Sequence, residues 1–238
     1  MLYIVVKKRK FILMSAIVVI VFLASLTFSI LQASNAFGSK YAAEYDTGLL
    51  IMIYIEEKKL YLFENNKCIK EYPIASGKPA SPSPIGQWMI TEKNNWGEAF
   101  GGRWLGLNVL WGKYGIHGTT RENTIGSAAS HGCIRMFNND IKDLYDRVTV
   151  GTPVIIIDGS YGPFGSGFRK LGPGDRGADV LAIQKRLKEL GYYSGKETGI
   201  YEDDLKKALY SFQRDKKLKI KYTITKEDYL AMGFTELE

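Results

Sequence analysis

The sequence predicts a membrane-spanning helix at the N-terminus, then a mostly β domain, then a small α-helical domain. Three observations lead to this fold class. Residues 11–33 carry no charge, short apolar runs separated by turn residues fill residues 49–157, and apolar residues recur three or four apart beyond residue 171. The length of 238 residues allows two compact domains and a tail but excludes a large multidomain enzyme.

The charge balance and the cysteine count exclude several classes of protein. The net charge is +7, and residues 7–10 (KKRK) supply four of these charges, so the remaining 28 basic and 25 acidic residues leave only +3. This charge is too small to predict a surface that binds nucleic acid. Only Cys68 and Cys133 are present, which excludes a disulfide-rich scaffold and a zinc site of four cysteines.

The uncharged stretch at residues 11–33 is predicted to be a transmembrane signal-anchor helix. Its 23 residues exceed the ~20 that cross the hydrocarbon core as a helix. Because a basic cluster precedes it, the positive-inside rule puts residues 1–10 in the cytoplasm and everything beyond the helix, starting with a linker at residues 34–48, outside. A cleaved signal peptide is the alternative, since residues 34–36 (SNA) are small enough for cleavage, and it leaves the topology unchanged.

Residues 49–158 are predicted to form the β domain. Strands are expected where apolar, β-branched and aromatic residues run together between turn residues. These runs are residues 49–55, 60–63, 68–74, 88–91, 104–110 and 154–157. Three of the seven prolines fall in residues 75–86, so this segment is predicted to be an exposed loop. Residues 138–148 (NNDIKDLYDRV) predict one amphipathic helix that starts at Asn and Asp.

A glycine-rich linker at residues 159–170 is predicted to separate the β domain from a helical domain at residues 171–238. Apolar residues recur at helical spacing over residues 180–190 and again over residues 205–212. A third, shorter helix is predicted to start at Thr225 with a capping-box signature. The expected domain therefore has three helices in about 65 residues, which is enough for a small independent core.

The residues that could carry chemistry are concentrated in one stretch. Both histidines and one of the two cysteines lie there: His117, His131 and Cys133. A thiol is a strong nucleophile as the thiolate, and a neighbouring imidazole can take its proton and later return it to a leaving amine. Neighbouring glycines permit sharp turns whose amides could hold a developing oxyanion, and Arg135 adds a positive charge that favours a thiolate or binds a carboxylate. This pattern indicates acyl transfer.

Residue types alone leave three other interpretations open. Cys133 and His117 could be ordinary core residues, because cysteine is often buried and histidine is often structural. A zinc ion could be held by His117, His131 and Cys133, with Cys68 as a fourth ligand. A Cys68–Cys133 disulfide is compatible with an extracytoplasmic domain and would abolish nucleophilic activity.

Two motifs resemble a known family. IHGT at residues 116–119 and SHGCIRM at residues 130–136 resemble the active-site signature of the L,D-transpeptidase (YkuD-type) catalytic domain. The resemblance extends over residues 49–158 and includes the YPIASGK, SPIG and GTPVIII segments. Residues 171–193, with ALYSFQ at residues 208–213, are similar to a three-helix peptidoglycan-binding module. The resemblance implies a β-sandwich-like catalytic domain with one or two helices.

The resemblance also implies a catalytic role for three residues. Cys133 would be the nucleophile and His117 the general acid and base. The backbone carbonyl of Gly118 would orient the imidazole in place of an acidic partner. No metal ion and no organic cofactor would be needed.

Further residues are expected to support this chemistry. The resemblance implies an oxyanion turn, formed with the Cys133 amide, and an arginine that supports the turn or holds the donor peptide. The residues concerned are Ser130, His131, Gly132 and Arg135. Tyr114 and Trp104 are candidate walls of the substrate pocket, with ordinary core packing as the alternative.

The implied reaction links peptidoglycan stem peptides. Cys133 would attack the third residue of a tetrapeptide stem, release D-alanine and pass the acyl group to an amine of a neighbouring stem, giving a 3→3 cross-link. Water or a free D-amino acid as acceptor would instead give an L,D-carboxypeptidase or an exchange enzyme. A catalytically silent wall-binding protein is the remaining alternative. The preferred diamino acid and the oligomeric state are left open.

Overall fold

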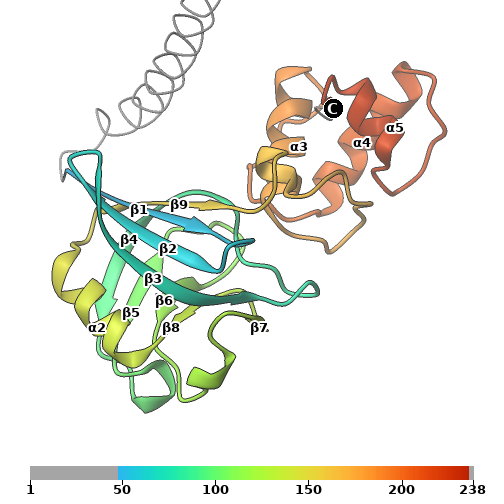
Figure 1. Ribbon diagram of the computed structural model, residues 1–238. Coiled ribbons are helices and arrows are strands. Elements are labelled where there is room, and N and C mark those ends of the chain that lie inside the picture. Colours follow the sequence, from blue (N-terminus) through green and yellow to red (C-terminus); the bar gives the residue numbers. More distant parts are fainter. Residues whose placement is uncertain (1–47, 236–238) are drawn as a thin grey trace, which may run out of the picture. The chain divides into compact units, whose positions relative to one another are not determined.

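The computed structural model describes residues 48–235, which fold into a β domain with one covering helix and a C-terminal group of three helices (Figure 1). The predicted order, a mostly β domain followed by a helical one, is confirmed. Within the described part of the chain, no helix has the length and apolar character needed to span a membrane. The anchor predicted at residues 11–33 lies outside the described residues and stays a prediction.

The β domain is built from nine strands within the described residues. They are β1 (Leu49–Tyr54), β2 (Lys59–Glu64), β3 (Lys67–Gly77), β4 (Gly86–Asn94), β5 (Trp104–Leu107), β6 (Tyr114–His117), β7 (Ala128–Ser130), β8 (Ile134–Met136) and β9 (Pro153–Ile157). The helix α2 (Asn138–Arg147) lies between β8 and β9, and the short 3-10 helices η1 (Glu98–Phe100) and η2 (Glu122–Thr124) lie in loops.

The nine strands form one sheet that closes on itself. The strand order is β2-β1-β9-β4-β5-β6-β8-β3-β7, and β3 also pairs with β2. Closure is possible because β3 is long: residues 67–73 pair with β2, whereas Ile74 and Ala75 pair with β8. In the same way β4 pairs with β9 through its first residues and with β5 through its last. The expected sandwich-like domain is thus a closed sheet whose two halves share β3 and β4.

The core lies inside this closed sheet. Alternate residues of the strands point inward, so β1 buries Ile51 and Ile53, two residues apart. Other core residues come from both halves of the sheet: Leu60, Leu62, Ile74, Ile90, Leu105, Ile116, Ile134, Val154 and Ile156. Helix α2 adds Ile141 and Leu144, which lie three apart on its buried face, and it contacts β6. This packing fixes the two strands that carry the candidate site.

The structure corrects the sequence prediction in two places. The segment predicted as a loop, residues 75–86, is strand up to Gly77 and again from Gly86, because its prolines lie only between these points and Ala75 and Ser76 find partners in β8 and β7. The sequence does not predict β6, β7 or β8. These strands have only three or four residues each, too few to show a strand pattern, so they form through pairing with distant strands.

The C-terminal domain contains the three predicted helices, α3 (Ala178–Glu189), α4 (Asp203–Asp215) and α5 (Lys226–Ala231), around a core of its own. The predicted capping box is present, since the Thr225 amide donates to the Asp228 carboxylate at 2.8 Å.

The predicted linker at residues 159–170 is partly ordered. It contains the 3-10 helix η3 (Gly162–Phe164), and its two phenylalanines pack on the helical core. Phe168 stacks on Tyr229 with ring centroids 4.5 Å apart, and Phe164 meets the same ring edge-on at 5.4 Å. Aromatic side chains therefore bind this segment to the helical domain although its glycines indicate a flexible linker.

Candidate active site

Neighbouring strands gather the candidate catalytic residues on one face of the sheet. β6 and β8 pair in parallel with His117 opposite Arg135, and β5 pairs with β6 with Trp104 opposite His117. Because opposed residues of paired strands project from the same face, these three side chains form a row. Cys133 lies just before β8, and its thiol is close enough to the backbone of Gly115 in β6 for that backbone to lower its pKa. The sequence separation between Cys133 and His117 is thus closed by strand pairing.

The His117 imidazole is buried and has a defined proton position. Its exposed fraction is 5%, and Nδ1 lies 2.5 Å from the carbonyl oxygen of Gly118. A carbonyl can only accept, so Nδ1 donates and Nε2 keeps its lone pair. The pKa of His117 is lowered from 6.5 to about 4, chiefly by burial and also by the Arg135 charge, against the opposing effect of the Gly118 bond. The imidazole is therefore neutral near pH 7 and can accept a proton at Nε2.

The Cys133 thiol is free and partly buried. Burial raises the pKa of this thiol, and this effect exceeds the lowering by the Gly115 backbone and by the Arg135 charge. The sequence suggested that Arg135 favours a thiolate, and its charge does act in that direction. However, burial outweighs it. The resting site therefore holds a neutral thiol beside a neutral imidazole, and the proton must leave sulfur as the bond to carbon forms.

A tight turn at residues 130–133 presents the nucleophile. The buried Ser130 hydroxyl donates to the Cys133 carbonyl at 2.6 Å and accepts from the Gly132 amide at 3.0 Å. Gly132 has φ of +114°, and a Cβ there would lie 2.5 Å from the Tyr114 ring, so only glycine fits. His131 is exposed and forms no hydrogen bond within the described residues.

The turn leaves two amides without an acceptor. The Gly132 amide donates to Ser130, whereas the amides of His131 and Cys133 have no acceptor in the part of the chain that the structure describes. Gly132 therefore contributes to the predicted oxyanion turn by letting the chain turn, because its amide is occupied. The amides of His131 and Cys133 are the donors that remain for an oxyanion.

The Gly118 carbonyl is held from two sides. The Gly118 amide donates to the Phe100 carbonyl at 3.0 Å, and a Cβ at Gly118 would lie 2.4 Å from the Asn138 side-chain oxygen. Asn138 Oδ1 also accepts from the Thr119 amide at 2.9 Å. The loop around η1 and the first residue of α2 thus fix the group that orients the imidazole. The sequence does not identify Phe100 or Asn138 as site residues, because both lie outside the motifs and meet Gly118 only by folding.

Trp104 supports the imidazole. Only 2% of Trp104 is exposed, and its ring stacks on His117 with centroids 5.6 Å apart. Its indole N–H donates to Glu92 Oε1 at 2.8 Å, a bond that lowers the pKa of Glu92, and Lys113 Nζ lies 3.4 Å from the same oxygen. Trp96 stacks on Trp104 at 4.3 Å. These contacts agree with the alternative prediction for Trp104, that of a core packing residue. The sequence does not identify Glu92 or Trp96, because neither lies in a motif.

Arg135 and Tyr114 are the polar groups that remain open to a ligand. The Arg135 Nε is buried without a partner, and the guanidinium forms no hydrogen bond or ion pair within residues 48–235. Tyr114 is half-buried and lines a cavity of about 700 Å³. Burial raises the pKa of its hydroxyl. Both residues therefore stand where the sequence predicts substrate contacts, but neither contact is itself observed.

The structure does not contain the disulfide considered as an alternative. Cys68 lies exposed on β3, with its sulfur 3.5 Å from the Lys70 carbonyl, and Cys68 and Cys133 are both free. Among residues 48–235, no group of three or more His, Cys, Asp or Glu side chains is arranged to hold a metal ion.

Comparison with known proteins assigns both domains. The family model of the L,D-transpeptidase catalytic domain matches residues 49–156, and that of a peptidoglycan binding domain matches residues 176–220. The solved catalytic domain of Enterococcus faecium L,D-transpeptidase is 25% identical, with a TM-score of 0.41, and the match covers 46% of this chain and 96% of that chain.

Two relatives from Bacillus subtilis (strain 168), both named as L,D-transpeptidases, match the β domain. YkuD is 44% identical over 107 residues, which cover 44% of this chain and 64% of that protein. YqjB is 33% identical over 124 residues, which cover 45% of this chain and 70% of that protein. The chain thus spans about two thirds of the length of these relatives. On this identity, and on the site described above, the chain belongs to the L,D-transpeptidase (YkuD-type) family.

Proposed function

We propose that this protein forms 3→3 cross-links between peptidoglycan stem peptides by cysteine acyl transfer. The observation that carries the proposal is the His117 imidazole, which is neutral, bonded through Nδ1 to the Gly118 carbonyl and free at Nε2. Such an imidazole can serve Cys133, on the adjoining strand segment, as a base and then as an acid. Membership of the family and the peptidoglycan-binding match supply the substrate class.

The first half-reaction forms a thioester. As the Cys133 sulfur attacks the carbonyl carbon of the third stem residue, Nε2 of His117 takes the thiol proton. The carbonyl oxygen gains negative charge and is met by the free Cys133 amide. When the tetrahedral intermediate collapses, the bond to D-alanine breaks, and His117 gives its proton to the departing amine.

The second half-reaction transfers the acyl group. The side-chain amine of a diamino acid in a neighbouring stem attacks the thioester and passes a proton to His117. The C–S bond then breaks, and the leaving sulfur recovers that proton. Each half-reaction starts and ends with a neutral imidazole and a neutral thiol, which fits the direction of both pKa shifts.

Arg135 is proposed to hold the donor stem. Its guanidinium has no partner among the described residues and lies close enough to His117 and Cys133 to change the pKa of both. A carboxylate of the stem would supply the missing partner through charge-assisted hydrogen bonds. Formation of such a pair would also remove the positive charge that opposes protonation of the imidazole.

The location is proposed from the sequence. Residues 11–33 would anchor the chain in the cell membrane as a single-pass helix, with residues 1–10 inside and both domains facing the cell wall. The helical domain would then raise the local concentration of substrate by binding the wall. Intact-mass measurement of protein from its host tests the anchor, since a mature chain that begins near Phe37 would indicate a cleaved signal peptide instead.

The test of the activity is incubation with a disaccharide tetrapeptide followed by mass analysis. Cross-linked dimers that have lost one D-alanine are expected. Tripeptides alone would indicate that water is the acceptor, hence an L,D-carboxypeptidase, and exchange of the terminal residue for an added D-amino acid would indicate an exchange enzyme. Absence of all three products would support the silent wall-binding protein.

A further inference from the structure

A cavity beside the nucleophile is lined by both domains. Its volume is about 700 Å³, and its walls come from the proline-rich loop (residues 78–85), Tyr114, the segment 163–169 and the start of the helical domain at residues 174–179. Tyr114 connects this cavity to the site, because its ring packs against Gly132 and its hydroxyl is close enough to Cys133 for the two groups to interact electrostatically. A ligand in the cavity would therefore meet Tyr114, the residue that packs against the turn that carries the reacting sulfur.

The two sides of the cavity are joined by Trp111. This residue follows β5, and only 4% of it is exposed. A Cβ added at Gly199 would lie only 2.4 Å from its ring, so the ring packs directly against that backbone. Trp111 also belongs to the same core cluster as Ala178 at the start of α3. On the catalytic side it meets Trp88 edge-on at 5.2 Å. The Trp111 indole thus packs against both domains and holds the two walls of the cavity in place.

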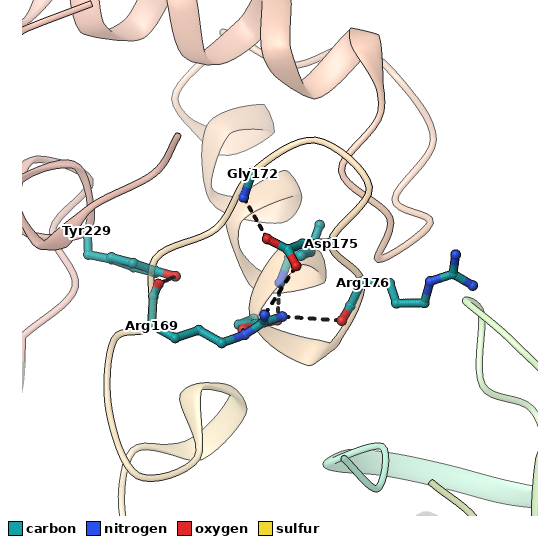
Figure 2. Close-up of polar contacts among 7 residues, drawn as sticks. Arg169, Gly172, Asp175, Arg176 and Tyr229 are labelled. Atoms are coloured by element: carbon teal, nitrogen blue, oxygen red, sulfur yellow. Dashed lines mark hydrogen bonds and ion pairs between the residues drawn. The ribbon is translucent and has the colours of Figure 1, made fainter. Parts of the chain in front are cut away.

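Two arginines, Arg169 and Arg176, line the cavity. The Arg169 guanidinium is engaged in hydrogen bonds within the protein. Arg169 Nε donates to the Asp179 carboxylate at 2.5 Å, and its other nitrogens lie 3.4 Å from Asp175 and 3.3 Å from the Arg176 carbonyl. Its own carbonyl accepts from the Tyr229 hydroxyl at 2.9 Å. Figure 2 shows these contacts as one network around the Arg169 guanidinium.

The second arginine, Arg176, is free to bind a ligand. Its side chain extends away from the Arg169 network, and no dashed line joins its guanidinium to another residue in Figure 2. No hydrogen bond or ion pair of this guanidinium exists within residues 48–235. Its charge acts on the Tyr114 hydroxyl across the cavity. Its backbone is fixed by pairing with Ile200, so the position of the side chain does not depend on the guanidinium.

A second observation indicates that the cavity receives a polar ligand. Ser76, at the end of β3, lines the cavity and has an exposed fraction of 0%, yet its hydroxyl has no hydrogen-bond partner. A buried hydroxyl without a hydrogen-bond partner destabilises the fold and calls for an explanation. A peptide group or carboxylate in the cavity would satisfy it.

The charges around the cavity fit a peptide with both acidic and basic groups. The carboxylates of Asp175 and Asp179 both pair with Arg169, so neither of them forms an ion pair with Arg176. A second pair of carboxylates, Glu56 and Asp158, also lines the cavity and lies within mutual electrostatic range. Stem peptides carry carboxylates and, at the diamino acid, an amine.

We infer that Arg176 binds a carboxylate of a peptidoglycan stem peptide, so that the helical domain completes the substrate site of the catalytic domain. This inference rests on the proposed function and goes beyond it, because it gives the helical domain a direct role in substrate binding. The stem could be the donor or the acceptor. The chemistry of recognition is the same, and kinetics distinguish the two.

The test compares Arg176→Gln with the unchanged protein in two arms. The first measures D-alanine release from a tetrapeptide stem at saturating hydroxylamine, which reports on the donor. The second varies the concentration of an acceptor stem at saturating donor. We expect KM to rise about tenfold in one arm, with kcat changed less than twofold, because a charge-assisted hydrogen bond is lost from binding. Arg176→Lys should recover part of the affinity, since it keeps the charge but loses the fork geometry.

Lys207→Gln is the matched control, because it removes one positive charge from an exposed position of α4 without a partner in the described chain. It should leave both KM values unchanged. The rate of Cys133 alkylation by iodoacetamide should be the same in all three variants. An unchanged KM for Arg176→Gln in both arms, or an equal rise in Lys207→Gln, would overturn the inference.

Failure of the proposed function is distinguishable from failure of this inference. If the unchanged protein gives no products, binding of the tetrapeptide can still be measured in Cys133→Ala and in the same variant with Arg176→Gln. A roughly tenfold weaker binding in the double variant would support the carboxylate site without any activity. Equal binding in the two proteins would exclude it.

Discussion

The catalytic domain and the helical domain differ in whether their buried polar side chains have hydrogen-bond partners. In the helical domain, buried Gln184 donates to Tyr193, Thr198 and Ile200, and buried Gln213 donates to Asp228 at 2.8 Å. Within residues 48–235, the buried side-chain atoms without a partner are Ser76 Oγ, Arg103 Nε and Arg135 Nε, all in the catalytic domain. Ser76 lines the cavity, and Arg135 lies in the row with His117.

This difference separates stabilising groups from functional ones. A satisfied buried network fixes one conformation, as Gln213 does by joining α4 to α5. A buried donor without a partner lowers stability, so it persists where a ligand supplies the partner. The positions of Ser76 Oγ and Arg135 Nε therefore indicate the substrate side of the catalytic domain independently of the sequence motif, whereas Arg103 is bonded through its Nη1 to Asn95 and Gly102.

The largest effect is expected from loss of the nucleophile. Cys133→Ala should reduce D-alanine release by at least about a thousandfold, because no other group can form the thioester. Stability should hardly change. Cys68→Ala, the matched control on an exposed position, should keep full activity, and a carbapenem-type acylating agent should add to Cys133 alone in intact-mass spectra. Residual cross-linking by Cys133→Ala would contradict the mechanism.

A large loss of stability is expected from the satisfied network of the helical domain. Gln213→Leu would leave Asp228 Oδ1 and the Lys221 amide without their partners, although Thr225 would still donate to Asp228 Oδ2. The free energy of unfolding should fall by about 2–4 kcal/mol, as measured by urea unfolding. Arg214→Ala on the exposed side of the same helix should change it by less than about 0.5 kcal/mol. Equal effects of the two substitutions would show that the network does not stabilise the domain.

The pH dependence tests the buried imidazole. The unfolded chain protonates His117 near pH 6.5, whereas the folded chain does so only near pH 4, so stability should fall by up to about 3 kcal/mol as the pH drops through this range. Activity should be kept at pH 5.5 and lost with an apparent pKa near 4. Urea unfolding and D-alanine release across this range measure both, with His117→Gln as the control for stability. A loss of activity on acidification with an apparent pKa near 6.5 would show that the imidazole is not desolvated.

A smaller effect on activity is expected when Trp104, which packs against the imidazole, is replaced. Trp104→Phe keeps an aromatic ring beside His117 but loses the indole bond to Glu92. We expect kcat to fall about tenfold because a small displacement of a catalytic group is costly, with KM nearly unchanged. Trp96→Phe, which makes a stacked ring smaller and costs no hydrogen bond among the described residues, should have a weaker effect. A change confined to KM would mean that Trp104 contacts the substrate, as the sequence first suggested.

The smallest change in stability is expected at Ser76. Because its hydroxyl has no partner, Ser76→Ala should leave the free energy of unfolding within about 0.5 kcal/mol of the unchanged protein or raise it. Ser130→Ala, which loses two hydrogen bonds, should destabilise by about 1–3 kcal/mol in the same unfolding assay. A clear loss of stability in Ser76→Ala would remove the argument for a ligand in the cavity.

Much of the fold could be predicted from local sequence. The long strands of the first half of the sheet, α2 and the three helices of the C-terminal domain all lie where periodicity and caps indicate them. The short strands β6 and β8 do not, because their residues have no strand pattern and are held by pairing with segments far away in the chain. These are the strands that carry the site.

The sequence by itself determined the order of the domains, the family, and the identity of Cys133, His117 and the Gly118 carbonyl as the candidate catalytic groups, because motif and spacing are local properties. Only the tertiary structure decided their protonation. Burial keeps the thiol neutral against the Arg135 charge, and burial and that charge together keep the imidazole neutral, where the motif alone suggested a thiolate. The fold likewise decided that Trp104 supports His117 and that Arg176 of the second domain faces the cavity, since both depend on packing between distant segments.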